Sequence, residues 1–206
     1  QVMTDPARGR IIRHGLNLQF PQTLIHWLLA ASALAAVTFF AAGLTLYFER
    51  SPRPPWVMAV HYLSMVLAVL QVTGVMLLPA RSESFVGLGI IMYTGSVLLY
   101  LAAIESAKRT RLQRSFVDHP LPDRLITDGP FRWVRHPFCS GYLLGALAAP
   151  IAIADERLAW IALLLVTVTV AAAVREERVW LSSAHADQYR AYRRRTGMFV
   201  PFVGRS

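Results

Sequence analysis

The sequence contains little charge and almost no cysteine. Charged residues make up 16 % of its 206 residues, well below the ~25 % typical of soluble domains. The single cysteine, Cys139, excludes an internal disulfide and a cysteine-based zinc or iron–sulfur site. We expect a buried, unreactive thiol at this position and no bound metal. The scarcity of charge favours a protein that lies largely in lipid.

Long apolar runs dominate the chain. Residues 23–48, 56–79 and 85–104 each reach the ~20 residues that cross a hydrocarbon core of ~30 Å. Residues 138–154 and 158–174 are close to the lower limit of ~17 residues. Because backbone groups in lipid need partners within their own segment, these runs should be helices. We predict an all-α integral membrane protein with about five transmembrane helices and a C-terminal cytoplasmic helix.

Basic residues set the expected orientation. The net charge is +9, and fourteen of the 21 basic residues lie either between the third and fourth runs or after the fifth. The positive-inside rule places both segments in the cytoplasm, so we expect a bacterial inner-membrane protein with its polar face inside. Arginine at a membrane border contacts anionic lipid, as we expect for Arg193, Arg194 and Arg195, and no nucleic-acid partner is expected.

The N-terminal segment conflicts with this orientation. Five spans place the N-terminus outside, where Arg8, Arg10 and Arg13 contradict the rule. The conflict is resolved if the C-terminal charges dominate or if "RIIRHGLNLQF" lies flat in the membrane interface. The first apolar run is too long for a secretory signal and lacks a clear cleavage site, so we expect it to be a membrane helix. We divide the single structural domain into N-terminal helices, residues 1–104, and a C-terminal part, residues 105–206, which contains the polar loop, the last two apolar runs and the tail.

The last two apolar runs predict a hairpin with charged ends. His136 precedes Glu156 by twenty residues and Glu176 follows it by twenty, so each arm is about 30 Å long. An antiparallel hairpin therefore returns Glu176 and Glu177 to the membrane face that holds Arg135 and His136. The sequence thus predicts two cations and two carboxylates at one border of the membrane.

Two motifs at this border carry a family resemblance. "GPFRWVRHPFCSG", residues 129–141, resembles the Gly-Pro-Tyr-Arg-Tyr-Val-Arg-His-Pro-x-Tyr-x-Gly signature of the isoprenylcysteine carboxyl methyltransferase family, whose architecture the membrane phospholipid methyltransferases share. "REERVWLSSAHADQYRAYRRRTGMFVP", residues 175–201, is similar to that family's Glu-Glu-x-x-Leu, Phe-Gly-x-x-Tyr-x-x-Tyr and Arg-Phe-x-Pro motifs. The matching residues here are Glu177, Leu181, Tyr189, Tyr192, Phe199 and Pro201. The resemblance covers roughly residues 123–202.

The resemblance implies S-adenosylmethionine as methyl donor, with S-adenosylhomocysteine as product, at the cytoplasmic end of the last hairpin. Arg135 and His136 suit the donor's carboxylate, and Glu176 or Glu177 suits its ammonium. Aromatic rings suit its adenine or sulfonium. The expected cofactor-binding residues are Trp133, Arg135, His136, Gly141, Glu176, Glu177, Tyr189 and Tyr192. The expected catalytic residues are His136, Glu177 and Arg135, with His136 or a glutamate taking a proton from an amine, thiol or phenol acceptor.

The acceptor is expected to be a lipophilic molecule or a lipid, methylated on oxygen, nitrogen or sulfur, since a site at the membrane border favours entry from the bilayer. Three departures from the signature qualify the resemblance: Cys139 replaces tyrosine, His185-Ala186 replaces Phe-Gly, and Met198 replaces arginine. The last change removes an anion partner, so a carboxylate substrate does not follow from the resemblance. Gly141 and Gly145 suit either close helix packing or contact with a ligand.

Two alternatives belong to other classes. His26 and His61 lie in apolar runs, where ionisable residues are often functional, as in membrane b-type cytochromes that bind haem through histidine pairs. The two histidines begin successive antiparallel runs, however, which separates them across the membrane, and interhelical hydrogen bonds are the simpler explanation. A sterol-reductase-like oxidoreductase shares the architecture, but the chain has no glycine-rich dinucleotide fingerprint.

Overall fold

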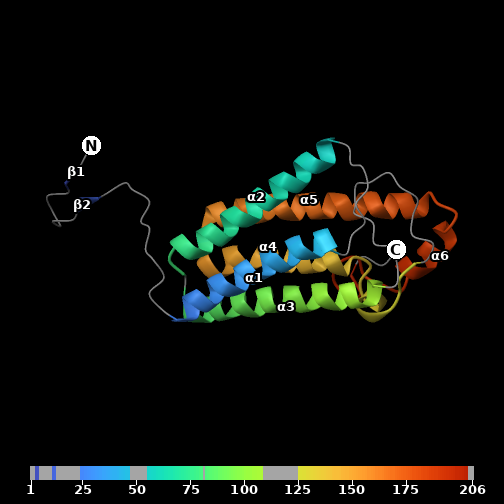
Figure 1. The fold of residues 1–206 in the computed structure, drawn as a ribbon, viewed down its shortest axis with the longest axis horizontal. Helices are drawn as coiled ribbons and strands as arrows, with labels where there is room; N and C mark the ends of the chain where they lie inside the picture. The colour runs from blue at the N-terminus through green and yellow to red at the C-terminus, as the bar shows by residue number, and fades with distance from the viewer. Residues whose placement is uncertain are drawn as a thin grey trace.

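A computed structural model describes residues 3–4, 11–12, 24–46, 55–80, 82–108 and 125–203. Within these ranges the chain forms six α-helices and one short 3-10 helix (Figure 1). Their bounds are α1 Leu24–Leu46, α2 Pro55–Leu77, α3 Glu83–Ala107, η1 Gly129–Arg132, α4 Pro137–Ile153, α5 Glu156–Leu181 and α6 Ala186–Arg193. A pair of two-residue antiparallel strands, β1 Met3–Thr4 and β2 Ile11–Ile12, precedes them. The predicted all-α fold is confirmed.

Helices α1 to α5 form at the five apolar runs. Four of them, α1, α2, α3 and α5, are long and apolar enough to cross a membrane, whereas α4 is a shorter apolar helix of 17 residues. At 1.5 Å per residue α4 is about 25 Å long, slightly less than the hydrocarbon core. The chain is therefore an integral membrane protein, and the count of five spans remains a prediction.

Small residues on α4 allow neighbouring helices to approach closely. α4 makes its most extensive contact with α3, and Ala148, Ala149 and Ala152 are fully buried in the core that they share with α1. A Cβ atom on Gly141 would lie 3.1 Å from the carbonyl oxygen of Ser96, and one on Gly145 would lie 3.4 Å from the Phe40 ring. These contacts are the close packing expected of small residues in membrane helices.

A tight turn joins α4 to α5 and makes them antiparallel (Figure 1). Ala154 ends α4 in the left-handed conformation, with φ 58°, and Asp155 caps α5 by accepting a 2.9 Å hydrogen bond from the Arg157 amide. The hydrogen bonds from Arg157 hold the pKa of Asp155 below its usual value. The predicted hairpin turn therefore has a specific local cause, namely an N-cap directly after a left-handed residue.

The polar tail after the fifth run first continues that run as helix and then turns. α5 continues past Val174 to Leu181, which carries Glu176 and Glu177 on the same helix as the apolar residues. The chain then turns at residues 182–185 and forms α6. The predicted interfacial segment at residues 10–20 lies outside the described residues, apart from Ile11–Ile12, which form β2.

Candidate active site

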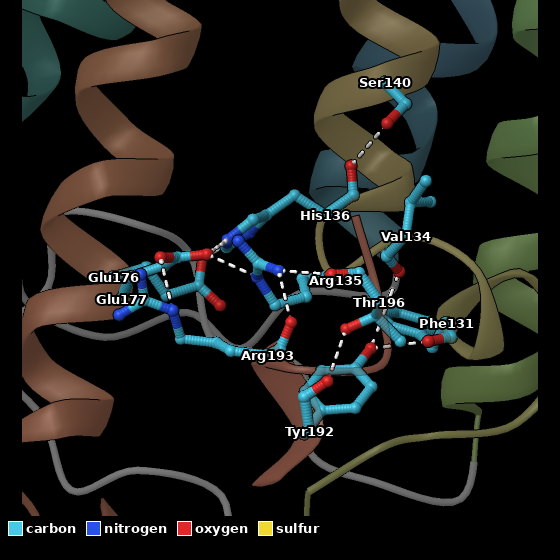
Figure 2. A network of polar contacts seen from close by, with 10 residues as sticks. All are labelled: Phe131, Val134, Arg135, His136, Ser140, Glu176, Glu177, Tyr192, Arg193 and Thr196. Carbon is cyan, nitrogen blue, oxygen red and sulfur yellow. Dashed lines mark hydrogen bonds and ion pairs between the residues drawn. The ribbon is translucent and has the colours of Figure 1, made fainter. Parts of the chain in front are cut away.

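A buried ion pair joins the start of α4 to the end of α5. The Nε atom of Arg135 donates a 2.6 Å hydrogen bond to Oε1 of Glu177 (Figure 2). Arg135 immediately precedes the His136 N-cap of α4, and Glu177 lies in the last turns of α5. The hairpin thus brings together the charged residues that the sequence places 42 positions apart.

His136 lies between the two neighbouring carboxylates. Its Nε2 atom is 3.4 Å from Glu177 Oε1, and its Nδ1 atom is 3.9 Å from Glu176 Oε2. The Glu177 side chain is 10 % exposed and the Glu176 side chain 40 %. Because one residue is a step of about 100° around a helix, the two carboxylates face different environments: Glu177 is enclosed, and Glu176 reaches solvent.

A strap formed by residues 196–199 closes over the start of α4. The Arg135 amide donates to Gly197 O at 2.8 Å, and the His136 amide donates to Met198 O at 3.2 Å. The Arg135 Nη1 atom donates to Thr196 O at 2.5 Å. Val134 and Gly197 pair as a parallel bridge. The strap therefore holds both the backbone and the guanidinium of Arg135 in place.

Gly197 is sterically required in this strap. A Cβ atom at this position would lie 1.9 Å from the carbonyl oxygen of Val200. Backbone atoms cannot yield as the end of a flexible side chain can, so any side chain here displaces the strap. Glycine is the residue that permits such a close approach of two backbone segments.

Two tyrosines of α6 fill the space beside the ion pair. The Tyr192 hydroxyl donates a 2.5 Å hydrogen bond to Phe131 O and fixes η1 against α6 (Figure 2). Tyr189 stacks on Trp180, with ring centroids 5.5 Å apart and planes inclined by 9°. Its buried hydroxyl makes no hydrogen bond within the described part of the chain. Burial raises the pKa of both tyrosines, and the charge of Glu177 raises that of Tyr189 further, so both remain neutral.

The remaining predicted cofactor residues lie apart from the ion pair. The Trp133 residue is 54 % exposed, and its ring is 6.0 Å from the Arg132 guanidinium carbon. Gly141 faces α3. The structure thus brings together Arg135, His136, Glu176 and Glu177, with Tyr189 and Tyr192 beside them, whereas Trp133 lies at the surface and Gly141 in a helix contact.

Arg193 is a site residue that sequence reasoning missed. Its Nε atom is 3.7 Å from Glu177 Oε2, and its side chain is 23 % exposed. Arg193 therefore approaches the buried carboxylate of Glu177, and the expectation that Arg193, Arg194 and Arg195 contact lipid headgroups stays a prediction. The helical register could have identified Arg193 as a site residue. It follows Tyr189 by four positions and Tyr192 by one, and Tyr189, Tyr192 and Arg193 share one face of α6.

The two histidines considered as haem ligands occupy separate positions. His26 is buried, and its Nε2 atom donates a 2.7 Å hydrogen bond to Val75 O near the end of α2. His61 is 14 residues before Val75 on α2, which places it about 21 Å along that helix. The structure supports the interhelical hydrogen bond as the role of His26, and the separation excludes one haem iron between the two histidines.

Four long apolar helices, a shorter fifth and a buried ionic cluster at one end of the bundle define an integral membrane protein with a polar site at the membrane border. The family model for phospholipid methyltransferases matches residues 84–188. The chain belongs to this family of membrane methyltransferases, in agreement with the resemblance of its motifs. No curated protein and no solved structure matches the chain.

Proposed function

We propose that the protein transfers a methyl group from S-adenosylmethionine to a lipophilic acceptor at the membrane border. The observation that carries the proposal is the buried cluster of Arg135, His136 and Glu177, which joins the ends of α4 and α5 in a member of a methyltransferase family. Perturbed and buried ionisable groups of this kind gather at functional sites.

The polar groups of the cluster suit the amino-acid part of this donor. The Tyr189 hydroxyl is buried without a hydrogen-bond partner among the described residues, and the contact of the buried His136 Nε2 atom with Glu177 Oε1 is long, at 3.4 Å, whereas buried polar atoms normally have well-formed hydrogen bonds. A zwitterionic ligand supplies partners for them. Glu177, and Glu176 at the solvent edge, would hold its ammonium, and His136 would hold its carboxylate.

Arg135 suits a positioning role in this arrangement. Its Nε atom donates to Glu177, and its Nη1 atom donates to Thr196 O and to Arg193 O at 3.3 Å. With these donors directed to protein atoms, Arg135 orients Glu177 and the strap. This refines the expectation that Arg135 contacts the donor directly.

When bound, S-adenosylmethionine supplies a methyl group that its positive sulfur has already activated. The protein's contribution is then to align the acceptor and to exclude water. Where the acceptor is an amine, thiol or phenol, Glu176, whose carboxylate reaches solvent, would receive the proton that the acceptor loses. The start of α4 and the end of α5, which carry the cluster, lie at one end of the apolar bundle (Figure 1), where a lipid or another membrane-dissolved acceptor would meet a water-soluble donor.

The arginine distribution supports a cytoplasmic site. Arg132, Arg135, Arg190 and Arg193 to Arg195 all lie at the end of the bundle where α4 begins and α5 ends, and basic residues are retained on the cytoplasmic side. In a bacterial cell this supports a location in the inner membrane, with the site facing the compartment in which the donor is made.

Calorimetry on detergent-purified protein tests the proposal with S-adenosylhomocysteine as the ligand. Glu177→Gln should weaken binding at least about tenfold, since removing one partner of a buried charge pair costs roughly 2–5 kcal/mol and each 1.4 kcal/mol is a factor of ten. His136→Ala should also weaken binding, and the double variant should lose less than the sum, because both residues act through one ligand.

Glu176→Gln is the matched control, because its half-exposed carboxylate is screened by solvent. It should change affinity less than Glu177→Gln does. Circular dichroism should show the same helix content for all variants. Absence of binding to the wild-type protein at millimolar ligand, or equal affinity of the wild type and folded Glu177→Gln, would contradict the proposed site.

A further inference from the structure

An apolar loop with exposed side chains follows the strap. Residues 200–203, Val-Pro-Phe-Val, are all exposed, and Val200, Phe202 and Val203 are 57, 68 and 63 % exposed. Four consecutive exposed apolar residues are unusual on a protein surface in water, and they mark contact with a membrane or another protein.

Backbone hydrogen bonds hold this loop in shape. The Met198 amide donates to Val203 O at 3.0 Å, and the Val203 amide donates to Val200 O at 3.2 Å. Phe202 adopts a left-handed conformation, with φ 67°, which costs energy for a residue with a Cβ atom. The exposure of these apolar side chains is thus built into an ordered turn.

The loop lies level with the first turn of α4. The Ser140 hydroxyl donates a 2.8 Å hydrogen bond to Phe199 O, and the His136 amide donates to Met198 O. His136 and Ser140 bracket the first turn of α4, where the apolar helix begins. Residues 200–203 are therefore tied to the depth at which the chain enters lipid.

Exposed cationic side chains lie next to the strap that leads into the loop. Arg194 and Arg195 precede the strap and are exposed, and Arg132 and Trp133, both exposed, adjoin its partner Val134. Arginine next to anionic headgroups stabilises binding by about 1 kcal/mol per residue, and tryptophan is enriched at membrane interfaces. Apolar residues bordered by cations complement the boundary between anionic headgroups and acyl chains.

We propose that residues 200–203 insert into the anionic headgroup–acyl boundary of the same bilayer that holds α1 to α5 and thereby hold the strap closed over Arg135. The inference rests on membrane integration and on the contacts of the strap, and it is independent of the identity of the methyl donor. The partner surface is the membrane itself.

Depth-dependent quenching tests this docking. A single nitrobenzoxadiazole label is placed at Val203→Cys, on a Cys139→Ser background, in nanodiscs of phosphatidylglycerol and phosphatidylcholine whose acyl chains carry bromine near the headgroup. The control label is at Asp187→Cys on α6, whose side chain is 98 % exposed. The label at position 203 should lose fluorescence to bromine, while the label at 187 should keep it.

A second pair of measurements tests the charge complementarity. Arg194→Gln/Arg195→Gln, or nanodiscs of phosphatidylcholine alone, should reduce quenching at position 203. Equal fluorescence at 203 and 187 would overturn the proposal. A blue-shifted but unquenched label at 203 would also overturn it, because the loop would then be covered by protein, such as a second copy. None of these readouts depends on donor binding, so they fail or succeed separately from the proposed function.

Discussion

Arg135 and Glu177 form a 2.6 Å ion pair across the hairpin of α4 and α5. Glu177 Oε1 is shared with His136 at 3.4 Å, and Oε2 approaches Arg193 at 3.7 Å. One carboxylate therefore connects the start of α4, the end of α5 and α6 (Figure 2). A buried carboxylate with several cationic neighbours is stable only while those neighbours remain.

Removing the arginine should therefore destabilise the fold strongly. Breaking a buried pair from one side costs roughly 3–5 kcal/mol, so Arg135→Gln should lower the apparent melting temperature in detergent by about 6–20 °C, at ~2–4 °C per kcal/mol for a chain of this length. Arg190→Gln is the control, because it breaks the exposed pair with Asp187 and surface pairs contribute about 0–1 kcal/mol. Equal shifts in melting temperature for the two variants would show that the buried pair contributes no more to stability than the exposed pair does.

Replacing the two tyrosines of α6 should affect two different properties: Tyr192→Phe should lower the stability of the protein, and Tyr189→Phe should weaken ligand binding. Tyr192→Phe removes the hydrogen bond to Phe131 O and should cost about 1–3 kcal/mol, because a buried acceptor is left unpaired. Tyr189→Phe removes a hydroxyl that has no partner in the described structure, so stability should be unchanged or slightly higher.

S-adenosylhomocysteine affinity, measured by calorimetry, should fall for Tyr189→Phe if its hydroxyl faces the ligand. A Tyr189→Phe variant that is destabilised as much as Tyr192→Phe would instead show that the hydroxyl has a structural partner.

A methyl group at Gly197 should open the strap. Gly197→Ala places a Cβ atom 1.9 Å from Val200 O, so residues 196–199 must shift, and Arg135 loses the carbonyl partners that orient it. Ligand affinity should fall together with thermal stability. Gly87→Ala is the matched control on α3, because a Cβ atom there meets nothing within 4 Å; alanine should stabilise that helix by about 0.5–1 kcal/mol. Similar behaviour of the two variants would contradict the steric account.

Cysteine labelling should place the two ends of α5 on opposite sides of the membrane. Glu156→Cys marks its start and Asp187→Cys the α6 helix beyond its end, both on a Cys139→Ser background. In intact cells, a membrane-impermeant maleimide should label position 156 and spare position 187 until the cells are opened. Labelling of both positions from outside would show that α5 does not cross the bilayer, and labelling of position 187 alone would reverse the proposed orientation.

The sequence predicted the helices well because hydrocarbon permits few backbone structures, and apolar runs of about twenty residues therefore mark helices directly. The meeting of Arg135, His136 and Glu177 followed from counting residues along two antiparallel arms. The strap could not be predicted in this way, because it consists of backbone contacts from Thr196 and Gly197, whose side chains carry no signature. The contact of Arg193 with Glu177 was not predicted, because Arg193 lies in a run of three arginines that we assigned together to lipid headgroups, and only the helical register distinguishes one of them from the next.

The unequal lengths of the helices determine which of them extends past the ionic cluster. α4 has 17 residues, against 25 in α3 and 26 in α5, so it is shorter by about 12–14 Å at 1.5 Å per residue. The end of α5 extends beyond the start of α4 (Figure 1), and α6, which follows it, is polar. The apolar residues 158–174 of α5 equal α4 in number, so the additional length of α5 consists largely of its charged last turns. We therefore expect the ionic cluster to lie at the level where α4 enters the bilayer, with the last turn of α5 and α6 further out in the aqueous phase.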